Sequence, residues 1–174
     1  MRVWVLRLGH RIKRDERIST HCGLVARAFG ANGIIYSGEK DNSLLDSIKK
    51  VVERFGGPFE VKYKKNWKKV IKEWKKKGEI VHLTVYGVPI QNSIKKIRSS
   101  TEDKLIVIGG AKVPSVVYEL SDWNISITSQ PHSEVASLAI FLDRFFKRKV
   151  LEKEFKNAKI KIVPQGSGKK VISL

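Results

Sequence analysis

The sequence has little that would stabilise a fold covalently or place it in a membrane. Cys22 is the one cysteine among 174 residues, so we expect no disulfide and a reducing, cytoplasmic location. No stretch approaches the roughly 20 consecutive apolar residues that a membrane helix needs. The segment Met1–Arg7 is too short and too charged for a secretory signal. We therefore expect a cytoplasmic protein held together by its hydrophobic core, and 174 residues suffice for a sizeable one.

Patterns for metal binding and for nucleotide-binding loops are also missing. The four histidines lie far apart, and no pair has the spacing of a metal-binding helix or zinc knuckle, so we expect no metal: His10, His21, His82 and His132. Gly166–Lys170 resembles part of a phosphate-binding loop, but Val171 stands where Ser or Thr is required and no helix follows. A hairpin turn explains that segment better.

Acidic residues are scarce. The chain has 35 Lys and Arg against 17 Asp and Glu, a formal net charge of +18 and a pI near 10.1. A chain this basic usually binds a polyanion, either nucleic acid or an anionic membrane surface. Nucleic acid is the partner that we favour.

The basic residues gather in three stretches. Arg7–Arg17 follows a predicted strand, Lys62–Lys77 is rich in lysine, and the tail from Lys147 onward is a basic arm. Arginines at a strand end suit phosphate capture, although a plain basic surface explains each stretch as well. The residues we single out for RNA contact are Arg7, Arg11, Arg14, Lys161, Lys169 and Lys170.

Short β-branched runs alternate with segments of helical periodicity along most of the chain. Strands are expected at Val3–Leu8, Gly33–Tyr36, Phe59–Tyr63, Ile80–Val85, Leu105–Ile108 and Ile125–Ile127. Helices are expected at Thr20–Phe29, Asp41–Phe55, Ile90–Arg98 and Val116–Leu120, and two more are expected after the caps Asn66 and Ser133. The segment Ile12–Ser19 is predicted to be a polar loop. This alternation predicts an α/β fold with a mostly parallel sheet flanked by helices. We expect residues 1–155 to form that domain and residues 156–174 a basic β-hairpin extension.

The stretch Leu105–Arg148 indicates where a ligand would bind. Two apolar runs end in the loops Gly109–Pro114 and Ser126–His132, and the second loop leads directly into a helix. Ligands of open α/β sheets bind outside the carboxyl ends of the strands. These two loops are therefore the predicted small-molecule pocket.

Six long motifs resemble one known family. They are LRLGHR (6–11), RDERISTHCGLVARAFGANGI (14–34), VHLTVYG (81–87), KVPSVVYELSDWN (112–124), QPHSEVASLAIFLDR (130–144) and KNAKIKIVPQGSGKKV (156–171). On these motifs, the sequence resembles the archaeal tRNA cytidine-56 2′-O-methyltransferases of the SPOUT superfamily, and the match extends over nearly the whole chain.

The resemblance implies a deep trefoil knot at the carboxyl end of the sheet, S-adenosylmethionine as cofactor, a tRNA substrate, and a homodimer in which each subunit contributes to its partner's active site. It places the cofactor contacts in the same two loops and one further position. The implied contacts are Leu83, Gly109, Gly110, Ala111, Lys112, Val113, Ile125, Ser126, Ile127, Thr128, Ser129, Gln130, Pro131 and His132.

The catalytic residues carry over less directly. The common superfamily pattern has an arginine six residues before the helix-closing glycine, where this chain has Leu24, so we take Arg17 and His21 as catalytic candidates and Arg11 as a phosphate anchor. A glutamate usual in the first loop is Ala111, and Ser133-Glu134-Val135 replaces the superfamily's serine-leucine-asparagine.

Three functions stay open on the sequence. The first is methylation of a tRNA ribose, the second is methylation of an RNA base with the same fold and cofactor, and the third is RNA binding without catalysis. The tail arm could contact RNA or serve dimerisation, and Thr84–Gly87 could be part of the cofactor pocket or a simple strand exit.

Overall fold

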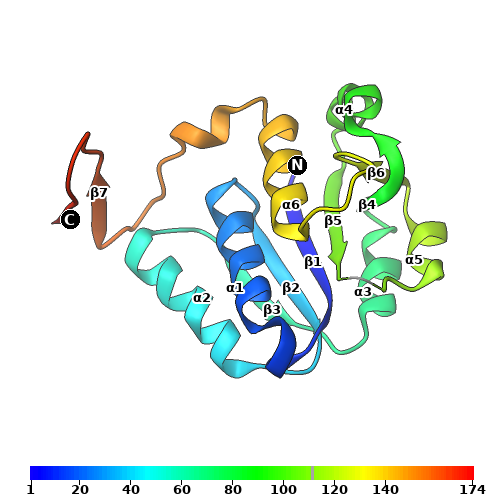
Figure 1. The fold of residues 1–174 in the computed structure, drawn as a ribbon, viewed down its shortest axis with the longest axis horizontal. Coiled ribbons are helices and arrows are strands. Elements are labelled where there is room, and N and C mark those ends of the chain that lie inside the picture. Colours follow the sequence, from blue (N-terminus) through cyan, green and yellow to red (C-terminus); the bar gives the residue numbers. More distant parts are fainter. Residues whose placement is uncertain (111) are drawn as a thin grey trace.

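The core of the protein is a six-stranded parallel sheet (Figure 1). The computed structural model describes residues 1–110 and 112–174. The sheet order is β3-β2-β1-β5-β4-β6, and every neighbouring pair is parallel, which confirms the predicted α/β class. Its strands are β1 Val3–His10, β2 Gly33–Gly38, β3 Glu60–Tyr63, β4 Gly78–Pro89, β5 Asp103–Gly109 and β6 Trp123–Ser126.

Helices cover both faces of the sheet, as βαβ connections require. They are α1 Ile12–Ala28, α2 Asn42–Phe55, α3 Trp67–Trp74, α4 Ile90–Ser99, α5 Ser115–Leu120 and α6 Glu134–Phe145, and a short 3-10 helix, η1, spans Lys149–Glu152. Alternate residues of the strands supply two hydrophobic clusters. Val3 and Val5 of β1 face the cluster under α1, α2, α4 and α6, whereas Leu6 and Leu8 face the cluster under α3 and α5.

The predicted loop Ile12–Ser19 is wrong, because α1 begins at Ile12 and not after Thr20. The sequence hides this start because no Ser, Thr, Asp or Asn precedes Ile12, and because two polar residues, Asp15 and Ser19, occupy the buried face of the first turns. One long-range and one local hydrogen bond replace the missing cap. Glu39 accepts a hydrogen bond from the Ile12 amide at 2.7 Å, and Asp15 accepts one from the Arg11 amide at 3.2 Å.

Helix caps that the sequence did predict are present. Ser133 accepts a hydrogen bond from the amide of Val135 at 3.0 Å at the start of α6, and Asn66 accepts one from Lys69 at 3.0 Å at the start of α3. These side chains satisfy amides that have no partner within the helix. The cap at Ser133 also fixes where the second predicted loop turns into helix.

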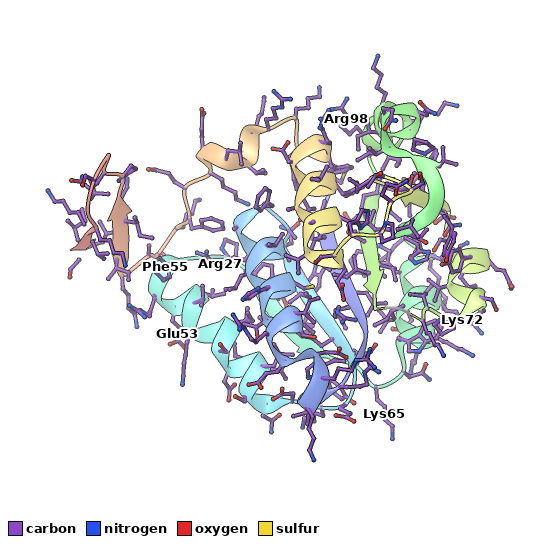
Figure 2. All side chains as sticks on the ribbon, viewed as in Figure 1. Arg27, Glu53, Phe55, Lys65, Lys72 and Arg98 are labelled. Carbon is purple, nitrogen blue, oxygen red and sulfur yellow. The ribbon has the colours of Figure 1, made fainter. Side chains whose placement is uncertain are left out.

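The tail forms a separate antiparallel hairpin, as predicted, with β7 Ile160–Val163 paired to β8 Lys170–Ser173. In Figure 1 it projects from the body beyond the end of α2. The chain leading to it is held at that end: Gly57 and Lys156 form a β-bridge, and the Lys159 amide donates to the Arg54 carbonyl at 2.9 Å. Nearby, Arg27 donates to the Phe55 carbonyl at 2.6 Å, a pair that Figure 2 labels.

In the part of the chain that the structure describes, no helix has the length and apolar character needed to cross a bilayer.

Candidate active site

Two cavities flank the loop that follows β5, at the carboxyl edge of the sheet. Gly109, Gly110 and Val113 border both cavities, so this loop forms a wall between them. One cavity has a volume of about 590 Å³ and the other about 730 Å³. Both volumes lie in the range usual for small-molecule sites, roughly 300–1,000 Å³. The predicted position of the ligand site, at the strand ends, thus contains two cavities.

We call the smaller one the neutral cavity. Besides the shared wall it is lined by His82, Leu83, Thr84, Val85, Tyr86, Tyr118, Ser129, Pro131, His132, Glu134 and Ser137. Glu134 is the one carboxylate in this described lining, which includes no lysine and no arginine. The cavity therefore suits a neutral or cationic molecule. Thr84, Val85 and Tyr86 reach it because β4 leaves register with β6 between Leu83 and Val88.

Several polar atoms of the neutral cavity are buried without a partner. Both ring nitrogens of His132 and Nε2 of His82 make no hydrogen bond within the described structure. His82 Nδ1 lies 2.9 Å from Asn124 Oδ1, so Nδ1 donates and Nε2 is left as an acceptor. Burial lowers the pKa of His82, opposed by the hydrogen bond to Asn124. Since unpaired buried polar atoms are costly, these nitrogens are available to water or to a ligand's polar groups.

A buried ion pair lies beneath the cavity wall. Arg7 Nη2 is 3.0 Å from Glu134 Oε1, and the Arg7 guanidinium also donates to the carbonyl of Leu8. Arg7 belongs to β1 and is 1% exposed, so its charge cannot reach an RNA phosphate. Arg7 is therefore removed from the residues proposed to contact RNA. It fixes the carboxylate that the neutral cavity presents.

We call the larger cavity the basic cavity. It is lined by Leu8, Gly9, His10, Arg11, Arg14, Asp15, Gly38, Glu39, Lys65, Trp67, Lys112 and Pro114, in addition to the shared wall. Arg11 is paired with Asp15, with Nε and Oδ2 3.0 Å apart. Burial raises the pKa of Asp15, but its hydrogen bond and charge contact with Arg11 outweigh this and lower the pKa overall, so Asp15 stays ionised.

His10, Ser19 and Asp41 are arranged like the triad of a hydrolase. His10 Nδ1 lies 2.9 Å from Ser19 Oγ, and its Nε2 lies 3.3 Å from Asp41 Oδ2. Ser19 is fully buried, however, and Asp41 caps α2 by accepting from the Leu44 amide. No substrate carbonyl can reach the serine, so the three side chains serve to tie the end of β1 to α1 and α2.

The predicted cofactor contacts divide into five groups. Those that line the neutral cavity are Leu83, Gly109, Gly110, Val113, Ser129, Pro131 and His132. Lys112 lines the basic cavity, and Ile125 and Ser126 are buried in β6. Ile127, Thr128 and Gln130 belong to the second loop but not to the lining, and Ala111 lies outside the described residues. Sequence reasoning missed His82, Tyr118, Glu134 and Ser137 as lining residues, since none belongs to the two predicted loops.

The two catalytic candidates lie elsewhere. Arg17 and His21 are exposed, one turn apart on α1, and line neither cavity of the single chain. The hairpin lysines Lys161, Lys169 and Lys170 are exposed as well, and Lys161 pairs with Glu154 at 2.9 Å. Across residues 1–110 and 112–174, no group of three or more His, Cys, Asp or Glu side chains could hold a metal ion.

Comparison with known proteins identifies a matching family and relatives of similar sequence. The model of one protein family, described as tRNA ribose 2′-O-methyltransferase, aTrm56, matches residues 55–172. The tRNA (cytidine(56)-2′-O)-methyltransferase of Thermococcus kodakarensis is 54% identical over 173 residues, covering 98% of this chain and 96% of that protein. The protein of the same name from Methanocaldococcus jannaschii is 55% identical over 174 residues, covering 99% and 97%.

Solved structures agree on the fold. The SpoU methyltransferase AviRb from Streptomyces viridochromogenes, in complex with AdoMet, has a TM-score of 0.57 at 16% identity and covers 84% of this chain and 57% of its own. A TrmH-family RNA methyltransferase from Porphyromonas gingivalis has a TM-score of 0.65 at 13% identity, covering 84% and 60%. With the sequence matches spanning almost its full length, the chain belongs to the aTrm56 family of tRNA ribose 2′-O-methyltransferases.

Proposed function

We propose that this chain transfers a methyl group from S-adenosylmethionine to the ribose 2′-hydroxyl of cytidine 56 in tRNA. The observation that carries the proposal is the 54–55% identity, over nearly the full length, to relatives named for that reaction. The net charge of +18 suits a tRNA substrate, because Lys and Arg supply affinity for phosphates of any sequence. Because tRNA is found in the cytoplasm, we expect the protein to act there.

The neutral cavity fits this cofactor. S-adenosylmethionine has a sulfonium, an ammonium and a carboxylate, so its net charge is positive, and a cavity with one carboxylate and no lysine or arginine suits it. The unpartnered nitrogens of His82 and His132 are available to its polar groups, and Leu83 and Val113 offer apolar surface to its adenine. The basic cavity would repel the same molecule. The bound cofactor supplies an activated methyl group.

The chain's own residues must position the substrate oxygen and accept a proton. In an in-line transfer the 2′-oxygen bonds to the methyl carbon as the carbon–sulfur bond breaks, the electron pair goes to sulfur, and the hydroxyl proton goes to a base. We propose the His21 imidazole as the acceptor of that proton and the Arg17 guanidinium as the group that holds the nucleotide. Positioning contributes roughly 7–11 kcal/mol to such reactions, and a general base adds about 10²–10⁴-fold.

A homodimer would reconcile these roles with the structure. Arg17 and His21 line neither cavity of their own chain, so we propose that α1 of one subunit faces the neutral cavity of its partner. Ile12 of α1 and Ile140 of α6 are each 42% exposed, so both helices offer apolar surface for a contact between subunits. We also propose that the chain forms the trefoil knot implied by the family resemblance, and that Lys161, Lys169 and Lys170 contact RNA.

The central test is methyl transfer from labelled S-adenosylmethionine to an unmodified tRNA transcript, with the labelled nucleotide identified after digestion. We expect 2′-O-methylcytidine at position 56, resistant to alkaline cleavage. Arg17→Ala and His21→Ala should each lower the rate by about 10²-fold or more, whereas Lys13→Ala, an exposed cation on the same helix, should not. Label on a base would favour the alternative of a base methyltransferase, and neither transfer nor cofactor binding would leave an RNA-binding protein.

Sharing of the site between subunits has its own test. Arg17→Ala is mixed with a variant whose neutral cavity is blocked, such as His132→Trp, under conditions that exchange subunits. If the sites are shared, one site of each mixed dimer is intact, so about a quarter of the wild-type activity should return at equal amounts. No recovery despite proven exchange would show that each subunit uses its own α1.

A further inference from the structure

The basic cavity is unexplained by the cofactor and is separated from the neutral cavity by the loop after β5. Its carboxylates are both engaged within the protein. Asp15 pairs with Arg11 at 3.0 Å, and Glu39 accepts from the Ile12 amide at 2.7 Å. Arg14, Lys65 and Lys112 line the same cavity, and in the described part of the chain none of them forms an ion pair. Three exposed cations are thus left for an anion from outside.

An aromatic side chain completes the lining. Trp67, the first residue of α3, packs against the hydrophobic cluster beneath the sheet and is only half-buried, so it also borders the cavity. A flat aromatic surface beside several cations is the arrangement that binds single-stranded nucleotides, because the base stacks while the phosphate is neutralised. At about 730 Å³ the cavity can hold a nucleotide and not merely a phosphate ion.

We propose that the basic cavity binds a nucleotide of the RNA adjacent to the one that is methylated, with its base against Trp67 and its phosphates at Arg14, Lys65 and Lys112. The inference rests on the proposed function, because the shared wall of Gly109, Gly110 and Val113 places a nucleotide bound there directly beside the cofactor cavity. The proposal gives a role to Lys65, which belongs to the lysine-rich stretch Lys62–Lys77. It also gives a role to Lys112, for which the family resemblance implies a cofactor contact.

The test compares matched lysines. Lys65→Glu changes a residue of the basic cavity, and Lys72→Glu makes the same charge change in α3 outside it. Figure 2 labels both side chains, Lys65 at the lower edge of the view and Lys72 at its right. tRNA binding is measured by fluorescence anisotropy over a range of salt concentrations. Lys65→Glu should reduce the slope of log K against log salt by about 0.7–0.9, the value of one phosphate contact, and Lys72→Glu should not.

Trp67 is tested separately. Trp67→Ala should weaken tRNA binding by roughly 5- to 150-fold, the loss expected for one base–aromatic stack, and Trp67→Phe should restore most of it. The fluorescence of Trp67 is the difference between the emission of the wild type and that of Trp67→Phe. RNA should quench this difference. Affinity for S-adenosylmethionine, measured by calorimetry, should stay unchanged in all of these variants because the neutral cavity is intact. Circular dichroism checks that Trp67→Ala folds.

Each outcome bears on one claim. If Lys65→Glu and Lys72→Glu weaken tRNA binding equally, the basic cavity does not bind RNA. The same conclusion follows if a free nucleoside monophosphate quenches Trp67 at lower concentrations than tRNA does, which would make the cavity a small-molecule site. Because tRNA binding is measured without catalysis, a wild-type protein that binds tRNA through Lys65 and Trp67 but transfers no methyl group would contradict the proposed function alone.

Discussion

The pair Arg7–Glu134 allows a quantitative prediction. The Arg7 side chain is 2% exposed and that of Glu134 is 16% exposed, with 3.0 Å between Nη2 and Oε1. Glu134→Gln removes the countercharge and leaves a guanidinium that has no access to water. Loss of one partner of a buried pair costs about 3–5 kcal/mol. Because Glu134 borders a cavity, we expect the lower end, about 3 kcal/mol, which corresponds to a fall in Tm of about 6–12 °C for a chain of this size.

A double-mutant cycle isolates the charge effect. Arg7→Met leaves a carboxylate that water in the neutral cavity can solvate, so its cost should be smaller than that of Glu134→Gln. The double variant Arg7→Met/Glu134→Gln has no unpaired charge and should be more stable than Glu134→Gln alone, with a coupling of at least about 1.5 kcal/mol. Asp46→Asn, which breaks the exposed pair with Lys49, is the control and should stay within about 0.5 kcal/mol of wild type.

Urea unfolding followed by circular dichroism gives the free energies, provided that the m-value is the same in all variants. The reasoning would be refuted if Glu134→Gln were as stable as Asp46→Asn, or if the effects of Arg7→Met and Glu134→Gln simply added. Either result would mean that water or another group already neutralises Arg7 in the folded protein.

Two further predictions concern buried titratable groups. Burial raises the pKa of Cys22 to about 12, so iodoacetamide at pH 8 should leave the native protein unlabelled and modify Cys22 rapidly in urea; labelling at equal rates would contradict its burial. Burial also lowers the pKa of His82 below its ordinary 6.5. Above pH 6.5 the contribution of His82 to stability is complete, and it falls as the pH drops below 6.5, because the unfolded chain then binds the proton more readily. His82→Gln should flatten that part of the profile of unfolding free energy against pH, and an NMR titration showing an ordinary pKa for His82 would contradict the prediction.

The sheet was predictable because its central strands contain short apolar runs, such as Leu105–Ile108, that are buried on both faces. The start of α1 was not, because its cap comes from Glu39, which is distant in sequence. Lys104 illustrates the same limit: it is fully buried in β5, where its charge pairs with Glu79 of β4 at 3.0 Å. Neither partner can be identified until the strands are placed side by side.

The position of the two cavities was predictable, but the residues that line them were not. Parallel strands end at one edge, so the loops after β5 and β6 had to lie together. The family resemblance implies that Lys112 contacts the cofactor, whereas in the structure it lines the basic cavity, and the sequence alone does not show which side of the β5 loop a residue faces. Arg7 was mistaken for a surface residue because its partner, Glu134, lies 127 positions further along the chain.

The loop of Gly109, Gly110 and Val113 has a further consequence, which is thermodynamic. If both cavities bind as proposed, a movement of this shared partition caused by one ligand would change the affinity at the other cavity. Whatever factor occupancy of one cavity imposes on affinity at the other, the reverse effect has the same size. Gly109 has no room for a side chain, because a Cβ there would lie 2.6 Å from Val113 Cγ2, so the partition can be this thin only with glycine at that position.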